Sequence, residues 1–285
     1  MRDAKAVITL FVLLVLAFSL TGGIFPVQAI TWGTEDTTNI YENVGTVVFY
    51  HLVYEDYFLL CSGTLIYEGD DNSYEAVFLT AAHCTYYLEL ATDQGLIDPE
   101  EIYVSFDPLD PLNVDTWYTV TEIHSHPDYN PITNRPDVGV LVLDGHVDDI
   151  TPAALPEEGF LDDLRRERTL RPKGSTGAYF TVAGYGGILE WPPPEITYPD
   201  TRSYAYSQFQ ALLKTQLRLS QNYAKSGNGG TCFGDSGGPV FWEPTNGERT
   251  LVAVTSWGDA NCIAAGFYYR IDTSEALNFI DQYMP

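Results

Sequence analysis

Residues 231–239 read Thr-Cys-Phe-Gly-Asp-Ser-Gly-Gly-Pro, and residues 79–84, far upstream, read Leu-Thr-Ala-Ala-His-Cys. A serine hydroxyl is a poor nucleophile at neutral pH and needs an adjacent base, with a third group to orient that base. The first stretch presents Ser236 in a glycine-rich turn, where backbone N–H groups can point at a developing oxyanion. The second presents His83 beside a cysteine, at the end of an apolar run. Together the two stretches indicate nucleophilic catalysis by a serine.

At these two places the chain resembles the chymotrypsin/trypsin family of serine endopeptidases, and among them a secreted, bacterial-type member. Residues 234–239 match the nucleophile motif of that family, and residues 80–84 match its histidine motif. The resemblance implies an all-β fold, with two antiparallel six-stranded β-barrels and a C-terminal α-helix. It also implies hydrolysis of peptide bonds through an acyl-enzyme on Ser236, with protein or peptide substrates and no cofactor.

The resemblance makes His83 the general base and Asp137 the carboxylate that orients it. Residues 135–143, Arg-Pro-Asp-Val-Gly-Val-Leu-Val-Leu, resemble the Asp-Ile-Ala-Leu-Leu strand of the family. Asp128 and Asp144 compete for the same role, but Asp128 lacks a following apolar run and Asp144 ends one. The other four histidines lack the motif: His51, His124, His126 and His146.

The oxyanion hole implied by the resemblance consists of the backbone N–H groups of Gly234 and Ser236, where glycine lets the peptide plane turn. Asp235 is expected to pair with the α-ammonium of Ile30, which would become the first residue of the mature protein. Seven positions match the substrate cleft: Gly230, Thr231, Phe233, Ser256, Trp257, Gly258 and Gly266.

The pocket that reads the substrate is predicted to be neutral. Gly230 stands where trypsin-like enzymes carry an aspartate, and glycine at 258 and 266 leaves the pocket walls open. Apolar burial then favours Phe, Tyr, Leu or Met before the scissile bond, a chymotrypsin-like preference. Asp259 at the pocket mouth offers the alternative, attraction of a basic side chain.

Residues 1–29 have the pattern of a signal peptide. Arg2 and Lys5 precede an apolar run over residues 6–20, and Val-Gln-Ala at 27–29 fits a cleavage site. An uncleaved membrane anchor is the alternative, but spanning a bilayer takes roughly 20 apolar residues. We expect a secreted, extracellular protein that has no membrane association after cleavage.

The chain is strongly acidic, with a formal net charge of −25. Loss of Arg2, Asp3 and Lys5 with the leader takes the net charge to −26, and residues 6–134 hold no Lys or Arg. Phosphate binding needs a basic surface, so nucleic acid is excluded as a partner. A hydrated monomer is expected. Residues 68–72, Glu-Gly-Asp-Asp-Asn, are the best calcium candidate, although they lack the full spacing of a known calcium loop.

Four cysteines in a secreted chain indicate two disulfides. Metal binding is the alternative, but the sequence has no Cys-x-x-Cys pair and no His-x-x-x-His cluster to support it. Sequence alone allows three pairings of four cysteines. The resemblance selects Cys61–Cys84 and Cys232–Cys262.

Short β-branched and aromatic runs between turn residues indicate barrels or sandwiches. The strand-like runs are residues 46–50, 57–60, 76–79, 138–143, 179–183, 239–242 and 251–254. Residues 272–275, Asp-Thr-Ser-Glu, offer a helix cap before apolar residues at helical spacing.

We expect a first barrel over residues 30–145, which carries His83 and Asp137, and a connecting segment over 146–172. A second barrel with Ser236 and the C-terminal helix is expected over 173–285. Two other functions stay open: a catalytically silent binding protein on this fold, and an esterase-biased hydrolase with the same triad.

Overall fold

A computed structural model describes residues 30–69, 75–171, 177–190, 195–244 and 249–285. The expected signal peptide over residues 1–29 lies outside the described residues, and so do residues 70–72 of the calcium candidate. Among the helices of the described ranges, none has the length and apolar character needed to cross a membrane.

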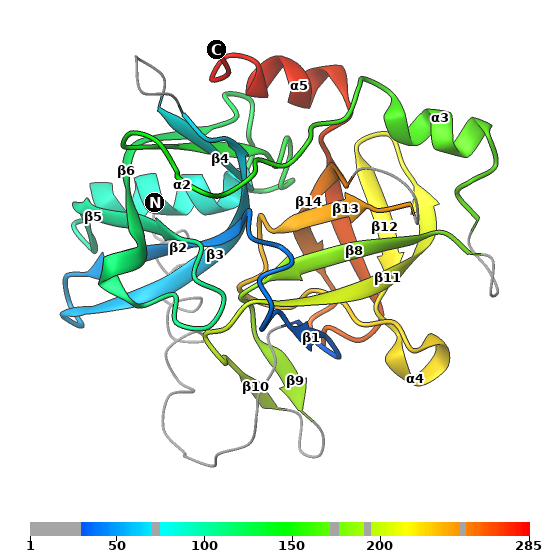
Figure 1. Cartoon of the computed structure of the whole chain (residues 1–285), viewed down its shortest axis with the longest axis horizontal. Helices are drawn as coiled ribbons and strands as arrows, with labels where there is room; N and C mark the ends of the chain where they lie inside the picture. The colour runs from blue at the N-terminus through cyan, green and yellow to red at the C-terminus, as the bar shows by residue number, and fades with distance from the viewer. Residues whose placement is uncertain (1–29, 70–74, 172–176, 191–194, 245–248) are drawn as a thin grey trace.

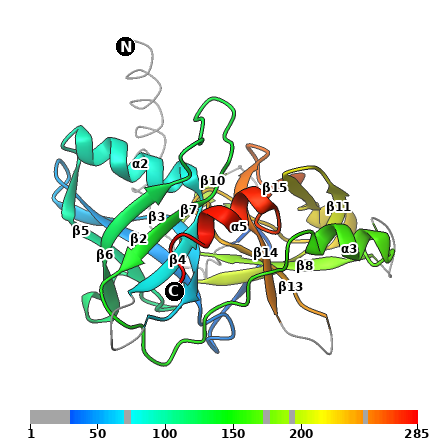
Figure 2. The same cartoon turned by 90° about the horizontal axis from the view of Figure 1, so that it is seen from above.

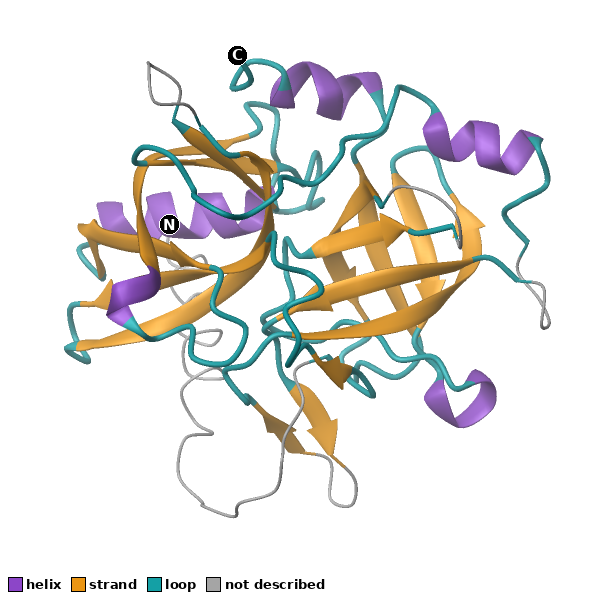
Figure 3. Ribbon diagram, in the orientation of Figure 1, coloured by secondary structure: helices purple, strands orange, loops and turns teal. Residues whose placement is uncertain are grey.

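The first half of the chain forms a closed antiparallel barrel with the strand order β2-β3-β4-β7-β6-β5. Buried apolar side chains fill it, among them Val47, Leu65, Phe78, Val104 and Leu141. The strands are β2 (Val44–His51), β3 (Asp56–Tyr67), β4 (Ala76–Thr80), β5 (Ile97–Ser105), β6 (Trp117–Ser125) and β7 (Gly139–Leu143). Figures 1 and 3 show this barrel on the left of the molecule.

The second half forms another antiparallel barrel, in the order β11-β12-β15-β14-β13-β8, which closes because β8 also pairs with β11. Its strands are β8 (Tyr179–Gly184), β11 (Ser203–Leu212), β12 (Gln216–Ser220), β13 (Pro239–Trp242), β14 (Thr250–Gly258) and β15 (Ala265–Arg270). The short β1 (Thr34–Glu35) pairs antiparallel with β11. Strands β9 (Ile188–Glu190) and β10 (Glu195–Thr197) form a separate antiparallel pair. The expected fold of two six-stranded barrels is confirmed.

The expected strand-like runs all lie in these strands, except that Val138 precedes β7. The expected C-terminal helix is α5 (Ser274–Ile280). Its cap is the Thr273 side chain, which accepts from the Ala276 N–H. Asp272 accepts hydrogen bonds from Arg270 and from the Leu161 N–H instead.

Helix α5 lies across the two halves of the molecule, as Figure 2 shows. Phe279 packs on His126, with ring centroids 5.1 Å apart, and Tyr283 stacks on His124 at 4.5 Å. His124 lies in β6 and His126 follows that strand directly, so the C-terminal residues pack against the first barrel. Both histidines thus take part in packing the C-terminal residues onto this barrel.

Four other helical segments were not expected from sequence: α2 (Ala82–Asp93), η1 (Val114–Thr116), α3 (Phe160–Arg166) and α4 (Tyr223–Ser226). Helix α2 begins after Ala81, whose side chain cannot cap it, and its first turns contain threonine and tyrosine. Such residues are weak helix formers, so the tertiary packing of Leu88 and Ala91 stabilises the helical conformation of this segment.

Arg202 joins the two barrels from a fully buried position just before β11. Its guanidinium forms an ion pair with buried Asp36 (Nε to Oδ2, 3.0 Å). It also donates to the carbonyl oxygens of Val44 in β2, at 2.7 Å, and Phe106 after β5, at 3.0 Å. One side chain therefore satisfies buried acceptors of the first barrel while it is anchored in the second.

Replacing Arg202 by methionine should lower the free energy of unfolding by about 3–5 kcal/mol, because it leaves the Asp36 carboxylate buried without its partner. Urea denaturation measures this. The matched control is Arg165→Met, which removes an exposed pair with Asp162 and should change stability by at most about 0.5 kcal/mol. Equal losses in the two variants would contradict the role given to Arg202.

Candidate active site

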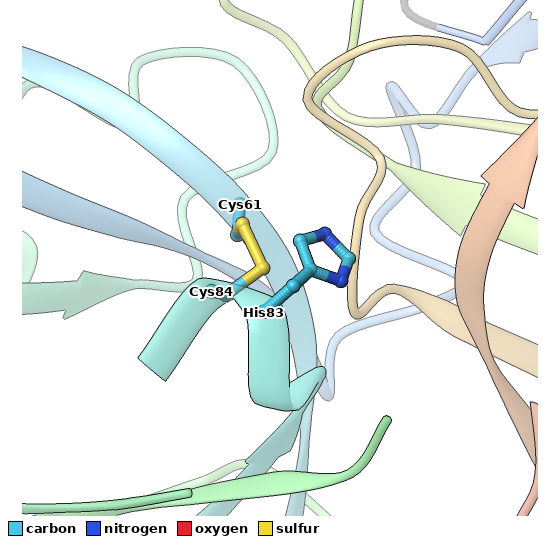
Figure 4. A group of neighbouring side chains, drawn as sticks. All are labelled: Cys61, His83 and Cys84. Carbon is cyan, nitrogen blue, oxygen red and sulfur yellow. A yellow bond between two sulfur atoms is a disulfide. The ribbon is translucent and has the colours of Figure 1, made fainter. Parts of the chain in front are cut away.

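His83 stands in the first turn of α2, held by the adjacent disulfide. Cys84 in α2 is bonded to Cys61 in β3, with Cα atoms 6.3 Å apart, which is the pairing that the resemblance implies. Figure 4 shows the two ring nitrogens of His83 facing away from this disulfide. The ligand atoms of Cys61, His83 and Cys84 lie within 4.8 Å of one another. The two sulfurs are bonded to each other, so they offer no thiolate to a metal ion.

Asp137 is fully buried and accepts hydrogen bonds from three separate parts of the chain. His83 donates its backbone N–H to Oδ1 at 3.0 Å, and its ring Nδ1 lies 3.0 Å from Oδ2. Asn134 Nδ2 donates to Oδ2 at 3.0 Å, and Ser256 Oγ donates to the same oxygen at 2.5 Å. A buried carboxylate with so many donors is satisfied, and it fixes the orientation of the imidazole.

The pKa of the His83 imidazole is raised above its ordinary value of 6.5. Burial of the ring acts to lower this pKa, but the negative charge of Asp137 and the hydrogen bond to it outweigh burial. The pair therefore favours an imidazole that takes up a proton readily near neutral pH.

The turn that carries Ser236 packs directly against the segment before His83. Ser62, next to Cys61, donates its N–H to the Ser236 carbonyl oxygen at 2.9 Å. A Cβ atom added at Gly237 would lie 2.7 Å from the backbone nitrogen of Ala81, so this approach needs glycine. Within the described ranges, neither Ser236 Oγ nor His83 Nε2 hydrogen-bonds to a protein group. Such contacts often tighten only when substrate binds.

Gly234 and Ser236 present backbone N–H groups that have no protein acceptor among the described residues. Gly234 has a φ of +95°, which favours glycine. Between them, Asp235 is fully buried and accepts from the N–H groups of Gly186 and Cys232, each at 2.8 Å. The second disulfide, Cys232–Cys262, holds this turn from the other side. The two N–H groups are therefore free to donate, which an oxyanion hole requires of its donors.

Burial raises the pKa of the Asp235 carboxyl to about 7. Its oxygens lie against Gly184 and Gly186, where an added Cβ atom would come within 2.3 Å and 2.6 Å of them. No cation contacts this carboxyl in the part of the chain that the structure describes. Ile30 is also completely buried, and its neighbour Thr31 pairs with Gly230, five residues before Asp235.

The end of β14 offers an unpaired edge beside this turn. Strand β13 pairs with β14 only as far as Val254, so within the described residues Ser256, Trp257 and Gly258 have a partner strand on one side alone, β15. Trp257 is 46% exposed and stacks on Phe267 with ring centroids 3.7 Å apart. An extended peptide can pair with such an edge.

We expected open pocket walls at Gly258 and Gly266, and the absence of charge at Gly230. An added Cβ atom would meet its nearest neighbour at 3.4 Å at Gly258, which leaves room there. At Gly266 it would lie 2.4 Å from the Tyr268 hydroxyl, and at Gly230 it would lie 2.2 Å from Gln221 Cγ. Two of the three positions are therefore filled by neighbouring side chains, which the sequence spacing could not reveal.

The remaining predicted substrate residues lie around the same turn. Phe233 is 44% exposed, whereas Thr231 is buried and its hydroxyl lies 3.2 Å from that of Tyr268. The Asp259 carboxylate accepts from four backbone N–H groups of its own loop, residues 261 and 263–265. Asp259 is thus held in its loop, which argues against its capture of a basic side chain.

Sequence reasoning missed Asn134 and gave Ser256 only a substrate role. Asn134 Nδ2 donates to both Asp137 and Ser256 Oγ, so the two residues complete the surroundings of the carboxylate. Proximity to Asp137 in sequence was the one signal for Asn134. The competing carboxylates, Asp128 and Asp144, are exposed.

Comparisons with known proteins agree with this fold. The family model described as Trypsin matches residues 47–280. A trypsin of Saccharopolyspora erythraea is 28% identical over 243 residues, covering 84% of this chain and 92% of that protein. The chain therefore belongs to the trypsin family.

Two other similar proteins are longer than this chain, which spans about half of one and about a fifth of the other. The venom serine protease Bi-VSP of Bombus ignitus is 28% identical, covering 71% of this chain and 55% of that protein. Clotting factor C of Tachypleus tridentatus is 28% identical, covering 74% of this chain and 21% of that protein. The solved structure of HL collagenase has the same fold, with a TM-score of 0.63, 20% identity, and coverage of 89% of this chain and 97% of that one.

Replacing Asp137 by asparagine should lower the pKa of His83 below 6.5, because it removes the negative charge that raises this pKa and leaves the burial that lowers it. An NMR titration of the imidazole measures this. The control Asp128→Asn removes a carboxylate that acts on His126 and should leave the His83 titration unchanged. A His83 pKa that stays raised in Asp137→Asn would contradict this account.

Proposed function

We propose that this protein is a secreted serine endopeptidase. The observation that carries the proposal is the pair of buried Asp137 and partly exposed His83, at 3.0 Å, together with the nearby Ser236 turn and its two unpaired N–H groups. This arrangement supports the joint action of a nucleophile, a base, an orienting carboxylate and oxyanion donors. The relatives that are named trypsin and serine protease support the same activity.

In the proposed mechanism, Ser236 Oγ attacks the carbonyl carbon of the substrate while His83 Nε2 takes its proton. Asp137 holds the imidazole through Nδ1 and stabilises the imidazolium. The N–H groups of Gly234 and Ser236 bind the negatively charged oxygen of the tetrahedral intermediate. His83 then gives the proton to the leaving amine. In the second half of the reaction His83 takes a proton from water, the water oxygen attacks the acyl carbon, and His83 returns the proton to Ser236 Oγ as the acyl group leaves. These steps use only the side chains and backbone of the protein, so we propose that it needs no cofactor.

The substrate is proposed to be an extended protein or peptide segment that pairs with the β14 edge at residues 256–258. No charged side chain stands at position 230, which supports a neutral pocket with a chymotrypsin-like preference. We assign residues 30–145 and 173–285 to two barrel domains joined by 146–172. The mature protein is proposed to act as an extracellular monomer.

A fluorophosphonate probe should add a single adduct to the secreted protein, since only an activated serine reacts with it. Intact mass spectrometry measures the adduct, and Ser236→Ala should show none. Rates on matched amide and ester substrates then distinguish a peptidase from an esterase-biased hydrolase. A folded protein without an adduct would instead support a catalytically silent binding protein.

Signal cleavage after residue 29 is proposed to free the α-ammonium of Ile30 to pair with Asp235. Both residues are completely buried. The Asp235 carboxyl, whose pKa burial raises to about 7, would gain a cation that stabilises its charged form. This ion pair would fix the backbone on either side of Asp235. It would thereby hold the N–H groups of Gly234 and Ser236, the proposed oxyanion donors, in place.

Protein that begins at Ile30 should therefore be roughly 10²-fold more active, in kcat/KM, than protein that keeps extra residues before it, the cost of losing an oxyanion donor. Peptide hydrolysis by the two forms, each verified by intact mass, measures this. A form that begins with Val in place of Ile30 is the control and should retain activity. Equal activity of extended and mature forms would rule out the pairing.

A further inference from the structure

Gln221, directly after β12, supplies the side chain at the base of the pocket where Gly230 has none. An added Cβ atom at Gly230 would lie 2.2 Å from Gln221 Cγ and 2.6 Å from Gln221 Nε2. The Gln221 amide therefore occupies the space into which a side chain at position 230 would extend. The polarity of this site is decided by a residue nine positions earlier in the chain.

The hydrogen bonds of Gln221 fix which way its amide faces. Its Nε2 donates to the Thr231 carbonyl oxygen at 2.8 Å and lies 3.1 Å from the Thr231 hydroxyl. Because a carbonyl oxygen only accepts, the nitrogen must be on this side and Oε1 on the other. The Oε1 atom lies 3.7 Å from the Cβ position of Gly258, the wall position at which an added Cβ atom would meet no clash.

Gln221 Oε1 is a buried acceptor without a partner. The residue is 1% exposed, and Oε1 accepts no hydrogen bond from any described group. Buried polar atoms are nearly always paired, and leaving one unpaired destabilises the folded protein. An acceptor that stays unpaired beside a wall position without a side chain is suited to a hydrogen-bond donor of a ligand.

The surroundings of this acceptor favour an uncharged donor. Asp259 is engaged by four backbone N–H groups. Asp235, whose charge acts on the neighbouring Tyr268, is engaged by two others. A lysine or arginine side chain here would be buried without a free carboxylate as its partner, which is costly. At Gly258 an added Cβ atom would make only ordinary van der Waals contacts, the nearest at 3.4 Å, so backbone without a side chain forms this wall.

We infer that Gln221 Oε1 accepts a hydrogen bond from the substrate side chain that precedes the scissile bond, and that this side chain is tyrosine in preference to phenylalanine. The inference rests on the proposed peptidase function and names its substrate class. A phenol combines a flat apolar ring with a terminal O–H donor. Phenylalanine in the same place would leave Oε1 unpaired, and sites built to bind a hydroxyl reject analogues that lack it.

Peptides that differ only in Tyr or Phe before the scissile bond test this directly. The wild-type protein should show a kcat/KM at least about tenfold higher for the Tyr peptide. Gln221→Met has a side chain of similar size without the acceptor, and its Tyr/Phe ratio should fall to about one. Gln221→Glu keeps the shape and adds charge, so its cleavage after lysine should rise relative to cleavage after tyrosine.

Binding to Ser236→Ala separates the pocket from the chemistry. N-acetyl-tyrosinamide should bind at least about tenfold more tightly than N-acetyl-phenylalaninamide, and adding Gln221→Met should abolish the difference. A Tyr/Phe ratio within about twofold in the wild type, or the same ratio in Gln221→Met, would overturn the inference. A binding preference for the tyrosine ligand in a protein that hydrolyses no peptide would support the pocket and refute the proposed function.

Discussion

The Asp137 carboxylate is the buried charge on which the rest of the site depends. A carboxylate removed from water is stable only when donors surround it, and here the donors come from α2, from the loop before β7 and from β14. The last of these belongs to the second barrel. Satisfying one buried charge therefore requires both barrels to be in place, and it brings His83 of the first barrel to the Ser236 turn of the second.

Other contacts across the same boundary act in the same direction. Arg202 is anchored beside β11 and satisfies carbonyl groups of the first barrel. The Ser62 hydroxyl donates to the Gly234 carbonyl oxygen at 3.1 Å and accepts from the Tyr185 N–H at 2.9 Å. Close approach of the backbones at Gly237 leaves no room for a side chain. Each contact is specific, so the relative position of the two barrels is defined by several independent constraints.

Much of this arrangement could be predicted from particular residues. The short alternating and β-branched runs predicted strands because a strand places alternate side chains on opposite faces, a purely local property. The motifs around His83 and Ser236 pointed to the candidate reacting side chains, since the motif lies in the immediate neighbours. Helix α2 could not be predicted, because its weak helix formers are overridden by packing against the first barrel. Asn134 and Ser256 could not be assigned to Asp137, because their partner is defined only when distant segments meet.

The proposed substrate pocket shows most clearly which features follow from the sequence and which depend on the tertiary structure. The sequence by itself determined the class of fold, the candidate residues of the catalytic group and the lack of charge at position 230, because each is written in residue type and local spacing. Only the tertiary structure decided that Gln221 fills the place beside Gly230 and that Tyr268 fills the place beside Gly266. A pocket is lined by side chains from strands that are far apart in the chain. Its polarity therefore depends on which of them meet in space, and that is settled by packing and not by sequence order.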